Sequence, residues 1–438
     1  MSTEESVILK QAEEFEEYVV GIQEDLHMHP EVSGEETRTI TKIISELEGM
    51  DLGYEVVPNG GIISIIEGGS HGKTLVLRAD IDALPMKEDD TNLKTEKKIV
   101  SKYDDAAHMC GHDGHTAMLL GAAKILVRQK ESLKGRIILA FEQGEEDGRG
   151  IVGILRRILE IGADGVWGIH LKADMPSGSI SVDPGPRMAG AFMFDVKIIG
   201  NGGHGARPDL ASTPLDVFTD FYNNLKSMRM NSLDPFKAIT FSIGSVNGGS
   251  NHNVIPDSLN FKGTFRYLHH DQGKRGELEF RERLDKIAAL HHCSYEYIRE
   301  PNAIDLSVYN NEDCAEIARK AVERSLGKEV LYNYPAWMAS EPFAFYQKYL
   351  PGIFAFIGIE NAEKGTGAGH HHPKFEIDTD VLKLGVAATV QYALDFLTSD
   401  EDIAFEPESK ALESLAKEAG IRVFPREGED HGDSWQER

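Results

Sequence analysis

The 438-residue sequence contains only three cysteines and has no long uncharged hydrophobic run. An odd number of widely spaced cysteines cannot form a fully paired disulfide framework, so it favours a reducing compartment. A transmembrane helix needs about 18 or more consecutive apolar residues, so no membrane span is expected. The N-terminal segment is acidic and lacks the basic start and apolar centre of a signal peptide. Together these absences predict a cytoplasmic protein.

Basic residues are also few, because 46 Lys and Arg stand against 72 Asp and Glu and give a formal net charge of −26. Nucleic acids and anionic membranes are bound through Lys and Arg that neutralise phosphate groups. The charge balance therefore argues against both as partners. The hydrophobic fraction of 41% and the charged fraction of 27% are those of an ordinary globular protein.

Strands and helices are expected to alternate along most of the chain, which predicts a mostly parallel sheet covered on both faces. The expected strands are residues 60–69, 73–85, 135–146, 165–171 and 352–359. The expected helices are residues 13–26, 36–50, 116–130, 150–162, 311–326 and 380–397.

The chain is long enough for two domains, since single cores rarely grow beyond about 250–300 residues. Between residues 187 and 298, strands and two helices predict a compact α+β unit inserted into a first domain made of residues 1–186 and 299–400. Residues 401–438 form an acidic C-terminal extension. Its last dozen residues are expected to be disordered because they are highly charged and poor in apolar residues.

Two short motifs resemble functional signatures but lack the required context. "GGSHG" at 68–72 matches the Gly-x-Ser-x-Gly elbow around Ser70, which needs a helix after the serine. A strand follows here, so the segment is expected to be a hairpin turn. "GKT" at 72–74 lacks the earlier glycine and the following helix of a phosphate-binding loop. Neither motif predicts a site.

Potential metal ligands gather in five segments, several of them at the ends of expected strands: "LRADIDALP", "HMCGHDGHTAM", "FEQGEEDGRG", "WGIHL" and "GAGHHHPKFEID". In an open α/β sheet, ligand groups collect at the carboxyl ends of the strands. A single His or Asp there is more often a satisfied structural residue, whereas several together favour a metal centre.

A dinuclear hydrolytic centre needs imidazole, thiolate or carboxylate ligands and one further carboxylate that accepts a proton from metal-bound water. The adjacent Glu145 and Glu146 can divide these two roles. A Glu–Glu pair alone would more often be a solvated loop, so the interpretation depends on the other segments.

These motifs resemble the amidohydrolase branch of the carboxypeptidase/aminoacylase metallopeptidase superfamily, which includes N-acyl-amino-acid amidohydrolases, hippurate hydrolase and plant auxin-conjugate hydrolases. The resemblance extends over about residues 15–398 and rests on "RADIDALP", "HMCGHDGHTAMLLG", "GEE", "GIHL", "GNGGHGARP", "NVIPD", "GTFR" and "HHPKFEID". It implies an α/β, mixed-sheet dinuclear metallohydrolase catalytic domain (1–186 and 299–400). The inserted α+β, ferredoxin-like unit (187–298) would be a lid and dimerisation domain.

The resemblance implies two divalent metal ions per subunit, Zn or Mn, with Co or Ni as alternatives. The implied ligands are Cys110, His112, Glu146, His170 and His371. Cys293 and Cys314 lack comparable neighbours.

The last of these ligands lies in a triplet of histidines. The family pattern is His, a variable residue, Pro, any residue and Phe. Pro373 and Phe375 therefore assign the ligand to His371 and leave His372 in the variable place.

Further roles follow from the resemblance. Glu145 matches the general base, and His204 would stabilise the oxyanion of the tetrahedral intermediate, arriving from a partner's lid. Asp82 and Asp113 would orient ligands rather than bind metal.

Asn253 and Arg266 match lid positions that would hold the substrate carboxylate. Two segments depart from the family pattern and leave the substrate open. Residues 142–144 are Glu-Gln-Gly in place of Gln-Pro-Ala, and residues 339–343 are Ala-Ser-Glu-Pro-Phe in place of Gly-Ser-Glu-Asp-Phe.

The expected activity is hydrolysis of the amide bond of N-acyl amino acids, with an acetyl, benzoyl or aryl-acyl group, by metal-bound hydroxide. The substrate would be a small molecule, and the protein a homodimer through its lid domain. Two alternatives remain: a dipeptidase or aminoacyl-conjugate peptidase, and a non-catalytic binding protein that keeps the metal.

Overall fold

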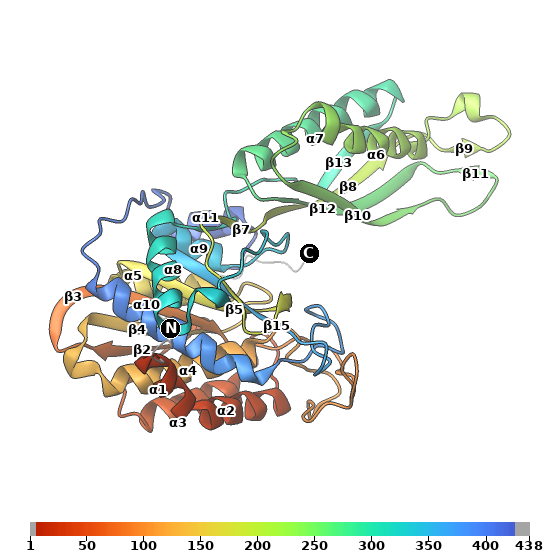
Figure 1. The fold of residues 1–438 in the computed structure, drawn as a ribbon. Helices are drawn as coiled ribbons and strands as arrows, with labels where there is room; N and C mark the ends of the chain where they lie inside the picture. Colours follow the sequence, from red (N-terminus) through yellow and green to blue (C-terminus); the bar gives the residue numbers. More distant parts are fainter. Residues whose placement is uncertain (1–5, 425–438) are drawn as a thin grey trace. The chain divides into compact units, whose positions relative to one another are not determined.

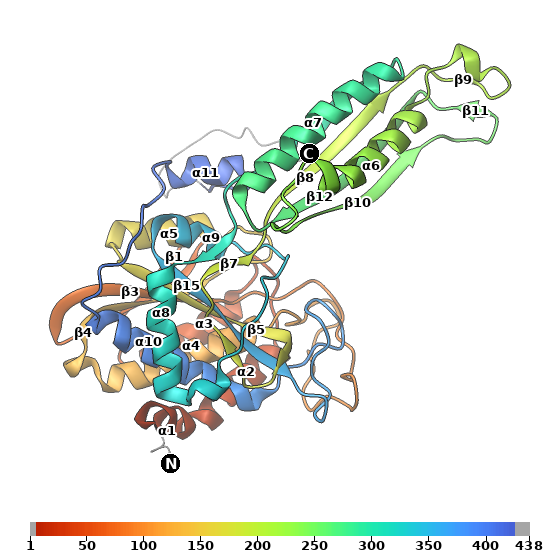
Figure 2. The same cartoon turned by 45° about the horizontal axis from the view of Figure 1, so that its top comes forward.

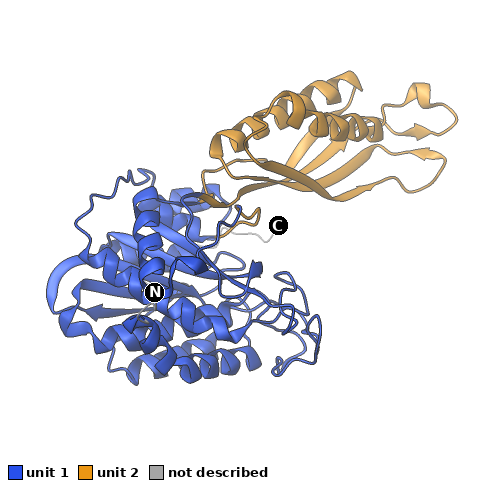
Figure 3. Cartoon of the chain, viewed as in Figure 1, with its two compact units in different colours: residues 1–185, 309–335, 342–438 blue, residues 186–308, 336–341 orange. Residues whose placement is uncertain are grey.

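The computed structural model describes residues 6–424 and divides the chain into two compact units (Figure 3). Unit 1 comprises Met1–Gly185, Tyr309–Pro335 and Pro342–Arg438, and unit 2 comprises Pro186–Val308 and Ala336–Glu341. The chain leaves unit 1 in β7 (Gly185–Met188) and returns in β14 (Val308–Asn310). The disorder expected for the last dozen residues concerns positions outside the described range.

Unit 1 is built on a seven-stranded sheet in the order β1-β2-β4-β3-β5-β15-β6. Its central strands are mutually parallel: β4 (Lys134–Glu142), β3 (Ser70–Asp80), β5 (Gly165–Pro176) and β15 (Gly352–Glu360). The outer strands join antiparallel: β1 (Tyr54–Val57), β2 (Gly61–Glu67) and β6 (Ile180–Ser181). The central strands read as near-continuous apolar runs because both faces are covered. The predicted mixed-sheet α/β fold is confirmed.

Helices cover both faces of this sheet (Figure 1). One face carries α1 (Val7–Glu14), α2 (Glu16–Met28), α3 (Thr37–Glu48), α4 (His112–Arg128), α8 (Glu312–Leu326) and α10 (Leu382–Thr398). The other face carries α5 (Ile151–Ile161) and α9 (Phe343–Tyr349), and α11 (Leu412–Glu418) packs on α5. Short 3₁₀ turns are η1 (Lys130–Ser132), η2 (Pro208–Leu210), η3 (Lys328–Val330) and η4 (Thr379–Val381).

Residues Thr379–Thr398, which include α10, are long and apolar enough to cross a membrane by length and composition. However, 72% of the most apolar window is buried inside the protein. The helix packs against both α4 and α8 (Figure 2), so its apolar surface is accounted for by the core of unit 1.

The expected hairpin at residues 68–72 is wrong. β2 ends at Glu67 and β3 begins at Ser70, but both strands pair with β4, which lies between them. The segment is therefore a turn between two strands that are not hydrogen-bonded to each other.

The carboxyl ends of the parallel strands meet at one edge of the sheet. The last residues of β3 and β4, Asp80 and Glu142, pair directly with each other. His170 on β5 pairs with Phe356 of β15. The loops that follow these strands therefore leave the sheet together, as expected for a ligand site in an open α/β sheet.

Unit 2 is a four-stranded antiparallel sheet in the order β10-β12-β8-β13 with two helices on one face. Its elements follow the β-α-β-β-α-β pattern of a ferredoxin-like fold. In chain order they are β8 (Gly190–Ile199), α6 (Pro214–Asn231), β10 (Ile239–Gly248), β12 (Ser258–Tyr267), α7 (His270–Leu290) and β13 (Ser294–Arg299). A small two-stranded sheet of β9 (Gly203–His204) and β11 (Val254–Ile255) lies at one end of the unit (Figure 1).

Candidate metal centre

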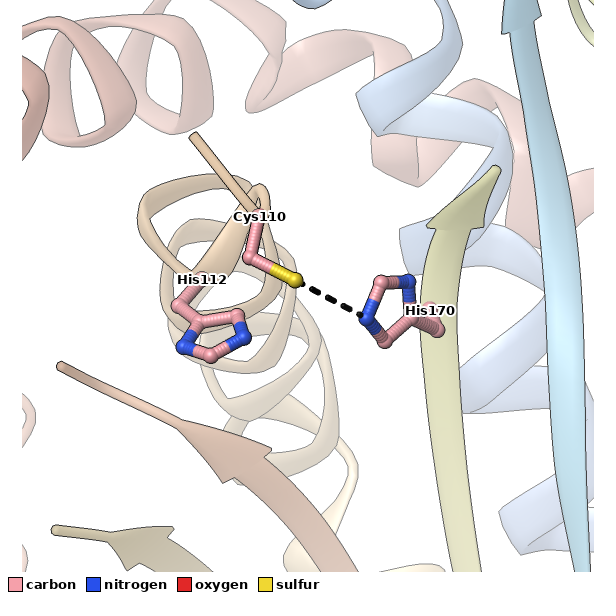
Figure 4. A group of neighbouring side chains, drawn as sticks. All are labelled: Cys110, His112 and His170. Carbon is pink, nitrogen blue, oxygen red and sulfur yellow. Dashed lines mark hydrogen bonds between the residues drawn. The ribbon is translucent and has the colours of Figure 1, made fainter. Parts of the chain in front are cut away.

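Cys110 and His112 flank the glycine that begins α4. Gly111 is the N-cap of the helix and has a φ of +94°, a conformation that side-chain-bearing residues rarely adopt. An added Cβ would also lie 3.1 Å from Leu171 Cδ1, which is tighter than ordinary contact. Glycine therefore permits the turn that brings the thiol and the imidazole to the same side of the helix start (Figure 4).

The side chains of Cys110, His112 and His170 form one group of potential ligands, with ligand atoms within 4.8 Å of one another. Cys110 Sγ lies 3.7 Å from His170 Nε2 (Figure 4). His170 Nδ1 lies 2.6 Å from the Leu171 carbonyl oxygen, to which it can only donate. Burial and the neighbouring histidines hold the pKa of His170 well below its ordinary value, so the ring is neutral and Nε2 presents its lone pair. A neutral imidazole is the form that binds metal.

A second group consists of Cys110, Glu146 and His371. His371 Nε2 lies 3.2 Å from Glu146 Oε1. The backbone N–H of His371 donates to the Met109 carbonyl oxygen at 2.8 Å, which ties the histidine loop to the residue before Cys110. Cys110 thus belongs to both groups and lies between them.

Two buried atoms of this cluster need a partner. Among the described residues, neither His112 Nε2 nor Glu146 Oε1 makes a hydrogen bond of good geometry, although His371 Nε2 lies 3.2 Å from Glu146 Oε1. Leaving a buried polar atom unsatisfied costs about 1–3 kcal/mol. A divalent cation would satisfy both atoms, and thiolate, imidazole and carboxylate are donors that such cations accept. The residues present therefore fit a divalent metal centre.

Glu145, which is 7% exposed, forms a further group of potential ligands with His112 and Glu146. His112 Nε2 is 3.8 Å from Glu145 Oε2 and 3.8 Å from Glu146 Oε1. Distance from His112 alone does not separate the two carboxylates. The group around His371 does, because it includes Glu146 and not Glu145.

Asp82 contacts ligands without belonging to any ligand group among the described residues. Its Oδ1 lies 3.1 Å from His112 Nδ1, and its Oδ2 accepts from the Glu146 backbone N–H and the Ser33 hydroxyl at 3.0 and 2.6 Å. This is the arrangement of a carboxylate that orients a metal-binding histidine. Asp113, expected to act in the same way, instead contacts His27 and Gln23.

Asp80 and His115, to which sequence analysis assigned no role, form a further cluster with His112. His115 Nδ1 lies 2.6 Å from Asp80 Oδ1, and His115 Nε2 accepts from the Leu171 backbone N–H at 2.9 Å. Both ring nitrogens are thus already hydrogen-bonded, so this group positions β5 rather than holding metal. The sequence did contain a signal for this cluster, because His112 and His115 are three positions apart and residues at this spacing lie on the same face of a helix.

Glu142, the first residue of the segment that departs from the family pattern, is fully buried. Its Oε2 accepts from Arg78 Nε at 2.8 Å and from the Tyr346 hydroxyl at 2.9 Å, while Arg78 Nη1 also donates to Asp80 at 2.7 Å. Burial raises the pKa of Glu142. This departure therefore lies beneath the strand ends and not on an exposed wall.

In unit 2, His204 lies in β9 and Asn253 directly precedes β11, so the two residues are close together. His204 pairs with Val254, and the Gly205 backbone N–H donates to the Asn253 carbonyl oxygen at 2.8 Å. Both side chains are exposed. His204 Nδ1 accepts from the Ala206 backbone N–H at 3.1 Å, so the neutral ring carries its proton on Nε2 and can donate outward.

Arg266 is not near these two residues. It lies eight positions beyond Ser258 along β12, about 26 Å at about 3.3 Å per residue. Its Nη1 donates to Ser340 Oγ at 2.8 Å, and it makes no ion pair with any described residue. Within one unit 2, Asn253 and Arg266 are therefore too far apart to hold one small carboxylate.

Together the fold and the site define a metal-dependent amidohydrolase of the α/β class. Residues 76–395 match the model of Peptidase family M20/M25/M40, and the chain belongs to this family. The predicted resemblance is confirmed.

Curated relatives of this chain include hydrolases that act on amides of amino acids by name. An IAA-amino acid hydrolase of Arabidopsis thaliana is 31% identical over 396 residues, which cover 89% of this chain and 88% of the relative. An N-acetyl-L-cysteine deacetylase of Bacillus subtilis is 32% identical over 390 residues, covering 88% and 90%. Among solved structures, a dinuclear metal-binding peptidase of the M20 family from Bacillus subtilis matches with a TM-score of 0.76 and 29% identity, covering 88% of this chain and 99% of that one.

Proposed function

We propose that this protein hydrolyses the amide bond of N-acyl amino acids at a centre of two divalent metal ions. The observation that carries the proposal is the pair of ligand groups that share Cys110, one with His112 and His170 and one with Glu146 and His371. The names of two relatives, an IAA-amino acid hydrolase and an N-acetyl-L-cysteine deacetylase, support an acyl amino acid as substrate. Thiolate and imidazole favour Zn, while the carboxylate accepts Mn, Co or Ni.

The bound ions would supply positive charge that polarises the amide carbonyl and makes water acidic. Glu145 would accept the proton of the attacking water and pass it to the leaving amine. Glu145 suits this role because it lies against His112 but outside the group that contains His371. Asp82 would hold His112 and the Glu146 backbone in place.

Unit 2 would act as the lid. His204 would donate from Nε2 to the oxyanion of the tetrahedral intermediate. Arg266 has no carboxylate partner among the described residues, which supports a role in holding the substrate carboxylate together with Asn253. Because Arg266 lies at the other end of the sheet from His204 and Asn253, the two ends would serve different active sites. This geometry supports a homodimer with shared sites. The three widely spaced cysteines support a location in the cytoplasm.

A substrate screen tests the proposal. Metal-free protein is loaded separately with Zn²⁺, Mn²⁺, Co²⁺ or Ni²⁺ and assayed for amino acid released from acetyl-, benzoyl- and indoleacetyl-amino acids and from dipeptides. We expect metal-dependent release from at least one N-acyl series at a rate above that for dipeptides. Faster dipeptide cleavage would favour a dipeptidase, and substrate binding without release would favour a non-catalytic binding protein.

A further inference from the structure

Four charged residues outside the ligand set form a buried row of paired side chains next to the metal centre, here called the charge chain. His27 Nδ1 lies 2.8 Å from Asp113 Oδ2, and His27 Nε2 lies 3.0 Å from Glu88 Oε1. Lys97 Nζ donates to the same Glu88 oxygen at 2.8 Å. The four residues are at most 9% exposed. They come from α2, α4 and the loop after β3, so the charge chain joins segments that are distant in sequence.

Both ends of this chain reach a ligand segment. Asp113 directly follows His112 in the first turn of α4. At the other end, Lys97 Nζ donates to the Pro373 carbonyl oxygen at 3.0 Å, two residues after His371. The charge chain thus connects the segment that carries Cys110 and His112 with the loop that carries His371.

Positive and negative residues alternate along the charge chain. Burial alone would lower the pKa of His27, but hydrogen bonds to Asp113 and Glu88 raise it to about 10, so the imidazole is protonated between two carboxylates. With Lys97 the sequence of charges is minus, plus, minus, plus. Buried ion pairs add little net stability, because desolvation offsets the Coulombic attraction. A positioning role explains this costly arrangement better than a stabilising one.

The loop at the far end needs external support. His371 has a φ of +61°, in the left-handed region that costs a non-glycine residue about 1–2 kcal/mol. Its side chain is half exposed, so packing alone does not hold it. The Pro373 carbonyl is held from two sides, by Lys97 Nζ and by the Asp89 backbone N–H at 3.1 Å.

We propose that Lys97 and Glu88 are positioning residues for the second ligand group. Anchored through His27 to Asp113, they set the place of the His371 loop relative to the start of α4. The affinity for the metal ion that His371, Glu146 and Cys110 would hold should depend on the charge chain. The affinity for the ion that His112 and His170 would hold should depend on it less. The inference rests on the proposed function only in taking these residues as metal ligands.

Neighbouring lysines provide a matched pair of variants. The Lys97 side chain is 0% exposed, while that of Lys98 is 81% exposed and pairs with Glu24. Metal-free Lys97→Met and Lys98→Met proteins are titrated with Zn²⁺ by calorimetry, and the thermal midpoint of each metal-free protein is recorded. We expect Lys97→Met to weaken one of two metal equivalents by about 10- to 100-fold, the range seen when outer-shell partners are lost. Lys98→Met should match wild type.

A second variant covers the case in which Lys97→Met fails to fold because Glu88 is left unpaired. The double variant Glu88→Leu/Lys97→Met removes both charges of the pair and should fold while showing the same selective loss of one equivalent. Wild-type affinity for both equivalents in either folded variant would overturn the proposal. So would equal weakening of both equivalents together with a lower midpoint, since that marks a general structural role. Because the readout is metal affinity, the result stands even if the wild type binds metal but cleaves no N-acyl amino acid.

Discussion

Glu145 and Glu146 are neighbours in the chain, but only Glu146 belongs to the ligand group that contains His371. Replacing Glu145 with Gln should lower kcat by about 10²- to 10⁴-fold, because a general base is lost. Its metal content should stay near that of wild type. Replacing Glu146 with Ala should instead remove metal, because a ligand is lost.

Metal analysis of the two purified variants, with turnover measured on the same samples, separates the roles. Similar metal loss in both would contradict the division of work between them.

Single residues also show how far the sequence predicts this site. Cys110, His112 and His170 occur in motifs with characteristic spacing, and the structure brings them together. Lys97 and His27 gave no comparable signal. Lysines are rarely buried, so the burial of Lys97 is not expected from the sequence. The His27–Glu88 contact joins residues 61 positions apart, so no local sequence pattern predicts it. Pairing of this kind becomes visible only when the fold is known.

At the scale of elements, prediction succeeded where a segment is long and apolar. The runs at β3, β4 and β5 are buried on both faces and read as strands from composition alone. Short elements such as β1 and α11 were missed because segments of four and seven residues are too short to show a clear periodicity. The mistaken hairpin at residues 68–72 has another cause, since the partner of a strand is decided by the whole sheet and not by the turn beside it.

The described part of the C-terminal extension packs on α5 through α11. Leu412, Leu415 and Ala416 are buried, and Arg156 Nε donates to Glu413 at 2.8 Å. Replacing Leu415 with Asp would place a charge in this apolar contact and undock the helix. We expect the thermal midpoint to fall by about 2–4 °C for each kcal/mol of docking free energy lost.

Ser414→Asp is the matched control, because Ser414 is exposed on the same helix while Leu415 is 3% exposed. Calorimetry of the two variants measures the difference. Equal midpoints would mean that α11 does not contribute to the stability of unit 1.

At the scale of the whole molecule, the lengths within unit 2 decide how an active site can be completed. His204 lies in β9 and Asn253 directly precedes β11, whereas Arg266 lies about 26 Å beyond Ser258 along β12, at about 3.3 Å per residue. An N-acyl amino acid is much shorter than this span. If all three residues contact substrate, one end of each unit 2 must therefore work with a different site from the other end, as a two-fold dimer allows.

Mixed dimers test this arrangement. His204→Ala and Glu145→Gln proteins, each inactive, are denatured and refolded together in equal amounts. If His204 acts in the partner's site, a mixed dimer has one site with both lesions and one with neither. Random pairing makes about half of the dimers mixed, so roughly a quarter of wild-type activity should return. A His204→Ala and Asn253→Ala mixture is the control, because each of its mixed sites keeps one lesion and stays impaired. No activity from a Glu145→Gln mixture shown to contain mixed dimers would mean that His204 does not act across the dimer.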